Sequence, residues 1–370
     1  MYSPEQLRHI AEQFDICGEI QEIKPLGPGF INDTLIVVTS SERYILQRKN
    51  HNVFPDVPGM MNNIDMLTKH IRDKIIAENG DPMRGTLTIC KRKSLSESEQ
   101  SLPYAKLYYK DGENYWTMCL FIEGSVTYTK ADSPELAYKG GKGLGHFHTQ
   151  LADFHTPLCE TIKGFHDFPS RYAQWRAAVE RDAAGRVKDL AEEISWVESR
   201  VPDMKAYWAL IENGSIPVRV SHNDTKISNI LFDKSGETLA VIDLDTCMST
   251  TVLNDYGDAI RTYTNTGEED DRNLDNVSMS FEMCKAYTEG YLSETGGILT
   301  ETELEHLPDG ARYIVYEQML RFLMDYIDGD TYYKTNAPDH NLVRTRAQHK
   351  LLVSIEEQFD KMKELIATFK

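Results

Sequence analysis

The run from Ser221 to Asn229 (SHNDTKISN) constrains this chain more than any other feature. The run is polar almost throughout, and it is followed shortly by the apolar pair Val241-Ile242 and then by Asp243. Such a pattern predicts a tight polar loop between two buried strands, the second of which ends at Asp243. The fold must therefore present several polar side chains of this loop close together.

The spacing of these side chains suits one kind of chemistry. Kinase catalytic loops carry His, Asp and Asn at the spacing of this run, and a strand ending in a metal-binding Asp follows them. Phosphoryl transfer needs a carboxylate to orient a hydroxyl, two oxygen ligands for Mg²⁺ and a cation on the transferring phosphate. We predict that Asp224 and Lys226 are catalytic and that Asn229 and Asp243 bind the metal. The alternative is an ordinary turn in which Asp and Asn only shape the backbone.

The composition is that of an ordinary globular protein, with 41% hydrophobic and 26% charged residues. The sequence has no apolar stretch of the roughly 18 residues that a membrane helix needs, and residues 1–6 do not resemble a signal peptide. Six scattered cysteines favour free thiols in a reducing compartment. A net charge of −18 repels nucleic acid and anionic lipid. We expect a cytoplasmic monomer without a nucleic-acid or membrane partner.

A length of 370 residues predicts two lobes. In the first part, periodicity and turn signals predict a short helix before Gly18, a long helix over about 60–75, and strands at 19–26, 31–39, 43–49, 86–90, 104–110 and 115–122. Beyond Gly124 the periodicity is helical, at 134–154, 187–197, 277–293, 309–328 and 341–368. We predict an α+β fold with an antiparallel-sheet nucleotide-binding lobe at 1–122 and a mostly helical catalytic and acceptor-binding lobe at 123–370.

A second group of candidates lies at the turn between the first two long strands. Gly27 and Gly29 would let backbone N–H groups approach the phosphates of ATP. The next strand should supply a phosphate-holding cation, and strand alternation places Leu46 and Arg48 on one face. We choose Arg48 over Lys49 because a guanidinium can grip phosphate oxygens in bidentate fashion, with Asp65 of the long helix to orient it. An ordinary Gly-Pro turn and a solvated strand end are the alternatives.

The lobe order, the 222–229 loop and the strand ending in Ile242-Asp243-Leu244-Asp245 resemble the aminoglycoside phosphotransferase and choline kinase group, which has a protein-kinase-like fold. This resemblance covers nearly the whole chain. Several stretches are most similar to N-acetylhexosamine 1-kinases: 29–34 (GFINDT), 45–48 (ILQR), 164–167 (GFHD), 255–262 (DYGDAIRT), 321–326 (RFLMDY), 329–333 (GDTYY) and 340–344 (HNLVR).

The resemblance implies an ATP- and Mg²⁺-dependent transferase that phosphorylates the anomeric hydroxyl of N-acetylglucosamine or N-acetylgalactosamine. On the nucleotide side it adds Asn32, Asp33 and Thr34 after the glycines, and Met118, Leu120 and Ile122 in an adenine hinge. On the acceptor side it implies Arg321 and Tyr332. Phe30 stands where these sugar kinases carry a histidine, so it can stack on a sugar ring but cannot donate a hydrogen bond.

Other functions stay open at this point. A kinase for a cationic alcohol (an aminoglycoside, choline, ethanolamine) would want carboxylates or aromatic rings around its acceptor, and the acidic run 268–271 could contribute them. A kinase for homoserine and a catalytically inactive, ATP-binding module are further alternatives. For Arg321, the alternative to ligand contact is an ion pair with Asp325, four residues further along a helix.

Overall fold

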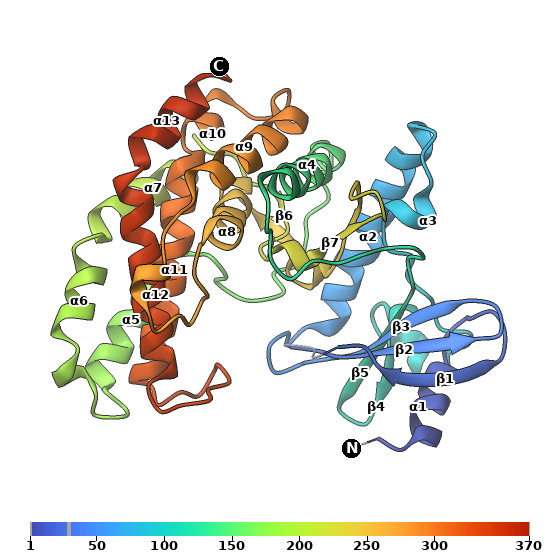
Figure 1. Ribbon diagram of the computed structural model, residues 1–370. Coiled ribbons are helices and arrows are strands. Elements are labelled where there is room, and N and C mark those ends of the chain that lie inside the picture. Colours follow the sequence, from blue (N-terminus) through green and yellow to red (C-terminus); the bar gives the residue numbers. More distant parts are fainter. Residues whose placement is uncertain (1, 28–30, 370) are drawn as a thin grey trace. The chain divides into compact units, whose positions relative to one another are not determined.

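The computed structural model describes residues 2–27 and 31–369, so the predicted site residues Gly29 and Phe30 lie outside it (Figure 1). The chain divides into two compact units. Unit 1 comprises Met1–Val126, Asp153–Lys163 and Leu231–Met248, and unit 2 comprises Thr127–Ala152, Gly164–Ile230 and Ser249–Lys370. The assignment of nucleotide and acceptor binding to lobes at 1–122 and 123–370 stays a prediction.

Unit 1 contains an antiparallel five-stranded sheet in the order β1-β2-β3-β5-β4. The elements that belong to it are α1 (Pro4–Ala11), β1 (Ile20–Pro25), β2 (Asp33–Thr39), β3 (Arg43–Lys49), α2 (Val57–Ala77), α3 (Pro82–Gly85), β4 (Tyr109–Asp111), β5 (Asn114–Leu120) and β8 (Thr238–Val241). β8 pairs with β7 (Ile230–Phe232). The predicted antiparallel sheet with one long helix is confirmed.

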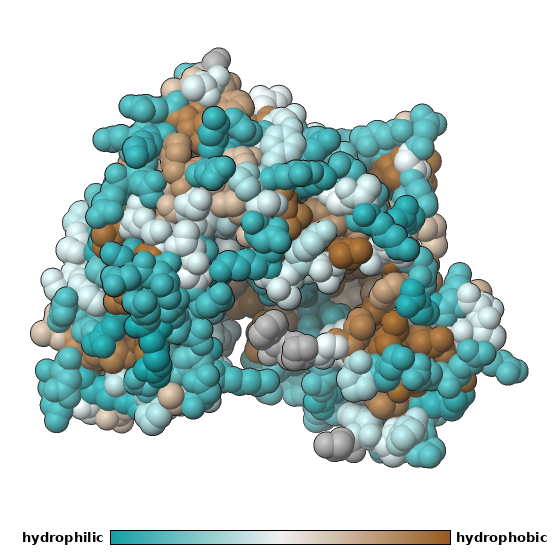
Figure 2. Space-filling view, viewed as in Figure 1, coloured by the Kyte–Doolittle hydropathy of each residue, from teal (hydrophilic) through white to brown (hydrophobic). Residues whose placement is uncertain are grey.

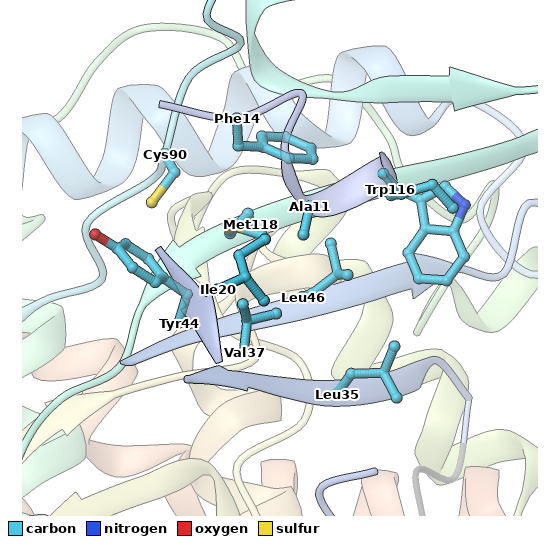
Figure 3. Packing of buried hydrophobic residues seen from close by; sticks show 11 residues of the cluster. Ala11, Phe14, Ile20, Leu35, Val37, Tyr44, Leu46, Cys90, Trp116 and Met118 are labelled. Atoms are coloured by element: carbon cyan, nitrogen blue, oxygen red, sulfur yellow. The ribbon is translucent and has the colours of Figure 1, made fainter. Parts of the chain in front are cut away.

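The core of unit 1 lies on the face of the sheet that α1 covers. A capping box starts this helix, since Gln6 N donates to Ser3 Oγ and Ser3 N donates to Gln6 Oε1. Ile10 and Phe14 belong to one buried cluster with Leu46 and Trp116, which are almost completely buried. Figure 3 shows Phe14, Leu46 and Trp116 in this cluster. Each such side chain contributes about 1.5–3 kcal/mol of transfer free energy, and the cluster therefore fixes which face of β3 points away from α1.

The predicted strand at 86–90 is wrong, and of the one at 104–110 only residues 109 and 110 are in a strand. The segment 86–90 makes only an isolated bridge, from Ile89 to Cys119 of β5. The segment 104–110 begins with Tyr104 in a left-handed conformation (φ 53°) and continues as a 3₁₀ turn, Ala105–Leu107. β4 is therefore short. Positive φ in an aromatic residue depends on surrounding structure, so local patterning does not reveal it.

Unit 2 is mostly helical. It contains α4 (Pro134–Gln150), α5 (Phe168–Arg181), α6 (Ala191–Glu198), α7 (Val201–Glu212), β6 (Arg219–Ser221), α8 (Val252–Thr264), α9 (Phe281–Thr295), α10 (Glu301–Glu305), α11 (Leu307–Ile327), α12 (His340–Glu357) and α13 (Phe359–Ala367). β6 pairs with β9 (Met248–Thr250). The predicted helix at 341–368 is two helices, because the chain leaves helical geometry at Gln358, whose side chain binds Met279 O at 2.9 Å.

Close packing in unit 2 centres on α11 and on the contact of α4 with α9. α11 packs against α5, α8 and α12, and α4 packs along α9 (Figure 1). At the contact of α4 with α9, a Cβ on Gly141 would lie 2.2 Å from Tyr287 O, and one on Gly290 would lie 2.0 Å from Tyr138 O. Only glycine allows this approach. The small residues of α4 and α9 thus permit the close contact between these two helices.

Hydrophilic residues cover much of the face shown in Figure 2. Among the described helices, none combines the length and the apolar character that crossing a bilayer requires.

Candidate active site

In unit 2, the 221–229 loop brings three predicted residues together. Asp224 Oδ2 accepts hydrogen bonds from Lys226 Nζ at 2.7 Å and from Asn229 Nδ2 at 3.1 Å. Asn229 Nδ2 also donates to Asp224 O at 2.8 Å. The Asp224 side chain is 26% exposed, so a hydroxyl group from solution can reach it. The loop thus presents one accessible carboxylate with a cation beside it.

Two carboxylates of α8 hold the backbone of this loop. Asp255 accepts from the backbone N–H of His222 and of Asn223, both at 2.6 Å. Asp258 Oδ2 accepts from Thr225 N at 2.8 Å. Charge-assisted hydrogen bonds of this kind are about twice as strong as neutral ones. The carbonyl and carboxylate of Asp224, which lies between these anchored residues, are thereby held in place.

Each anchoring carboxylate has a partner of its own. His148 Nε2 lies 2.8 Å from Asp255 Oδ2, and His148 Nδ1 lies 2.9 Å from the Tyr291 hydroxyl. Arg261 donates two hydrogen bonds to Asp258 Oδ1. Burial alone would raise the pKa of Asp258, but the charge of Arg261 outweighs it and lowers the pKa. Asp258 therefore stays ionised although it is buried.

Sequence reasoning gave Asp255, Asp258 and His148 no role in a site. The available signal was the pair of acidic residues three positions apart in the segment that follows Asp243. That spacing places both on one helix face, but it does not say which loop they meet.

A second buried network holds the segment 164–167 to the same loop. His166 Nδ1 lies 2.6 Å from Glu317 Oε2, and its Nε2 lies 3.4 Å from Asn223 O. Arg171 Nε donates to Glu317 Oε1 at 2.9 Å. Burial alone would raise the pKa of Glu317, but His166 and Arg171 outweigh it and lower this pKa to about 2. Phe165, next to His166, is thereby fixed close to the catalytic loop.

Arg321 lies among aromatic rings on α11. Its guanidinium carbon is 5.4 Å from the ring centre of Phe165, 6.0 Å from that of Tyr332 and 5.7 Å from that of Tyr333. Its side chain donates one hydrogen bond, from Nη1 to Gln318 Oε1 at 3.2 Å. Within residues 2–27 and 31–369 it forms no ion pair with a carboxylate. The alternative of an Arg321–Asp325 pair is wrong, because Asp325 binds backbone N–H groups of residues 331–333 instead.

In unit 1, Lys49 forms a buried ion pair with Asp245. Lys49 Nζ donates to Asp245 Oδ1 at 2.7 Å and to Asp245 Oδ2 at 2.8 Å, and the two side chains are 3% and 4% exposed. Asn32 Nδ2 donates to Asp245 Oδ2 at 2.7 Å. Lys49 Nζ also donates to Gln47 Oε1, so Gln47 and Lys49 share one face of β3.

The reason for choosing Arg48 over Lys49 was mistaken. Leu46 and Arg48 do share a face, but it is the face that packs under α1, with the Arg48 guanidinium 6.0 Å from the Tyr2 ring centre. Arg48 Nε donates to Asp33 Oδ2 at 2.8 Å, and these side chains are 38% and 62% exposed. Asp65 pairs with Lys69 rather than with a β3 cation. Lys49 is identified by the fact that α1 covers the opposite face of β3. Sequence periodicity alone does not tell which face of β3 α1 covers.

The remaining nucleotide-side candidates are spread over β2 and β5. Gly27 has φ +69° with open space where a Cβ would lie, and Thr34 Oγ1 accepts from Gln47 at 3.2 Å. Met118 is 1% exposed and belongs to the α1-side core, against which Leu120 also packs. The Met118 side chain therefore has a core role and is not placed to contact a nucleotide. Ile122 packs instead with Leu231 and Ala240.

The predicted metal ligands fit Mg²⁺ by their chemistry. The Asn229 amide donates both of these hydrogen bonds to Asp224 from its nitrogen, so its oxygen faces away from that residue. Asp243 adopts a left-handed backbone conformation (φ 60°) at the end of the β8 hairpin. An amide oxygen and a carboxylate are hard oxygen donors of the type that Mg²⁺ prefers. No described group of three His, Cys, Asp or Glu side chains forms an all-protein metal cage.

The fold resembles that of small-molecule phosphotransferases with a kinase-like architecture. An aminoglycoside phosphotransferase from Alicyclobacillus acidocaldarius is similar over 98% of this chain and 97% of that chain, with TM-score 0.59 and 13% identity. A spectinomycin phosphotransferase crystallised with ADP and spectinomycin matches with TM-score 0.57 and 15% identity, over 100% and 98% of the two chains. A choline/ethanolamine kinase family protein from Mesorhizobium loti matches with TM-score 0.56 and 11% identity, over 98% and 99%.

The sequence itself assigns the family. The model of the phosphotransferase enzyme family matches residues 22–278, and this chain belongs to that family. The matched region includes β2, β3, the 221–229 loop and the anchoring helix α8.

Proposed function

We propose that this chain is an ATP- and Mg²⁺-dependent kinase that phosphorylates the anomeric hydroxyl of N-acetylglucosamine or N-acetylgalactosamine, in carbohydrate metabolism, as a cytoplasmic monomer. The observation that carries the kinase assignment is the accessible Asp224 carboxylate, with Lys226 and Asn229 bound to it and its loop anchored on α8. Membership of the phosphotransferase family supports the same reaction class.

In this proposal, Asp224 accepts a hydrogen bond from the acceptor hydroxyl and directs its oxygen at the γ-phosphorus of ATP. The new O–P bond forms as the bond to ADP breaks, and the hydroxyl proton passes to the Asp224 carboxylate. Lys226, whose Nζ lies 2.7 Å from Asp224 Oδ2, balances negative charge on the transferring group. The anchored backbone supplies orientation, which is a major source of rate enhancement in this chemistry.

The nucleotide side of the proposal comprises a metal ion and the groups around the ATP phosphates. Asn229 and Asp243 would hold Mg²⁺, which neutralises charge on the phosphates when bound. Lys49 would replace Arg48 as the cation for the ATP phosphates, because it is held by Asp245 on the face away from α1. Gly27, Asn32 and Thr34 would line the phosphates. The spectinomycin phosphotransferase was crystallised with ADP, which supports nucleotide binding in this fold.

For the acceptor, the charge around Arg321 favours a neutral or anionic molecule. Its guanidinium has no described carboxylate partner, so a cationic alcohol placed beside it would be repelled. Sugar hydroxyl and N-acetyl oxygens accept hydrogen bonds from a guanidinium, and the ring of Tyr332, 59% exposed, offers a face to the sugar C–H groups. Arg321 and Tyr332 are therefore the acceptor residues of this proposal.

The acidic run 268–271 gives little support to a cationic acceptor. Glu269 Oε1 accepts from Arg261 at 2.8 Å, and Asp270 lies 2.8 Å from His340 Nε2. Glu268 pairs with Lys130 at 3.3 Å. These carboxylates are thus engaged with cations or histidine of the protein itself.

A panel of acceptors with ATP and Mg²⁺ tests the proposal. We expect ADP release with N-acetylhexosamines, and a phosphorus NMR signal coupled to the anomeric proton of the product. Asp224→Asn should lower kcat at least about a hundredfold, whereas Asp233→Asn, in an exposed turn, is the matched control and should not. Preference for choline, homoserine or an aminoglycoside defeats the sugar assignment. ATP binding without turnover of any acceptor favours an inactive binding module.

A further inference from the structure

Asp325 makes an unusual set of contacts near the C-terminal end of α11. Its Oδ1 accepts the backbone N–H of Thr331 and of Tyr332, both at 2.8 Å. Its Oδ2 accepts the backbone N–H of Tyr333 at 3.0 Å and a hydrogen bond from Asn341 Nδ2 at 2.8 Å. The residue is 5% exposed. One buried carboxylate therefore binds three consecutive backbone N–H groups, and an ionised carboxylate has the acceptor sites to do so.

These bonds fix the direction of two tyrosine side chains. With the backbone of 331–333 tied to one anion, the rings of Tyr332 and Tyr333 pack edge to face with centres 4.8 Å apart. Both rings lie within 6.0 Å of the Arg321 guanidinium carbon. The support extends behind Asp325, because Asn341 also donates to Asp330 at 2.9 Å. The loop is thus held from α11 and from α12.

The tyrosines and Arg321 are connected to the catalytic loop through Phe165. The Phe165 ring lies 5.4 Å from the Arg321 guanidinium carbon, and it packs on His166 with ring centres 4.1 Å apart. His166 in turn lies 3.4 Å from the carbonyl oxygen of Asn223, the residue before Asp224. All of these residues belong to unit 2.

We propose that Asp325 is a positioning residue for the acceptor: it holds residues 331–333 so that Tyr332 and Tyr333 flank Arg321 and form one wall of the acceptor site. This rests on the proposed use of Arg321 in acceptor binding. In this proposal the wall contacts the acceptor and does not contact the nucleotide. Loss of Asp325 should therefore weaken acceptor binding and leave ATP binding as it is.

The test is Asp325→Asn, assayed with whichever acceptor the wild-type protein turns over. The amide keeps the shape but turns an NH₂ group toward the N–H of Tyr333 or of Thr331 and Tyr332, which are donors as well. We expect KM for the acceptor to rise at least about tenfold, with KM for ATP changed less than about twofold. Amide hydrogen exchange should be faster at residues 331–333, a readout that needs no acceptor.

Asp328→Asn is the matched control, because Asp328 ends the same helix and pairs with Arg181 at the surface. It should change neither KM. Tyr332→Ala, at an exposed position, tests the wall if Asp325→Asn does not fold, and it should raise the acceptor KM similarly. Unchanged acceptor KM in Asp325→Asn or Tyr332→Ala overturns the positioning role. If the acceptor is not a sugar but the KM pattern holds, only the sugar assignment fails.

Discussion

Substituting Lys49 is the sharpest test of the nucleotide side. Lys49→Met removes one partner of a pair whose side chains are 3% and 4% exposed. The Asp245 carboxylate would then stay buried, with Asn32 as its remaining hydrogen-bond donor among the described contacts. Breaking a buried ion pair from one side costs about 3–5 kcal/mol, because the remaining charge is desolvated without compensation. We expect a loss of this size in the free energy of unfolding.

Arg48→Met is the control on the adjacent position of the same strand. Its partner is Asp33, and the two side chains are 38% and 62% exposed. Exposed ion pairs contribute about 0–1 kcal/mol to the free energy of unfolding, so Arg48→Met should lower it by no more than that. Removing both charges of the buried pair, in Lys49→Met/Asp245→Leu, should recover much of the stability because no unpaired charge remains.

Urea unfolding measures the stabilities, and initial rates at varied ATP and acceptor measure the function. We expect Lys49→Met, at a temperature where it is folded, to raise KM for ATP and lower kcat, with Arg48→Met close to wild type. Equal losses of stability in the two variants would refute the reasoning about burial. A larger rise in ATP KM for Arg48→Met would show that Arg48 is the phosphate-binding cation after all.

The metal and pH behaviour supply two further predictions. Asn229→Ala and Asp243→Asn should each raise the Mg²⁺ concentration for half-maximal rate at least about tenfold. If the two residues hold the same ion, the effect of the double variant on this concentration should differ clearly from the sum of the single effects in free energy. Full additivity would show that the two residues have separate roles. The pKa of Glu317, about 2 in the folded protein, lies below the ordinary value, so its stabilising contribution is present above about pH 4.3 and is lost as pH falls toward 2. In urea unfolding, Glu317→Gln should therefore lower the free energy of unfolding by roughly 3 kcal/mol at pH 7 and by progressively less below pH 4. If the difference in unfolding free energy between wild type and variant does not shrink with acid, the pKa of Glu317 is not lowered.

Local signals predicted much of the fold. β3 has the predicted bounds, and α2, α4, α9 and α11 lie where the hydrophobic spacing placed them. α8 was not predicted, because polar residues such as Asp255 occupy its buried side and obscure the apolar stripe. The break between α12 and α13 was missed as well, because it depends on a contact of Gln358 with a distant backbone carbonyl.

The sequence by itself indicated the phosphotransferase class and predicted that Asp224, Lys226 and Asn229 lie together, because they fall within six residues and a local turn is enough to bring them together. Tertiary structure alone decided which β3 cation is buried with Asp245, 196 residues away along the chain. It also decided that Asp325 binds a loop rather than Arg321. Spacing predicts neighbours within one element, whereas these two choices depend on which face another segment covers.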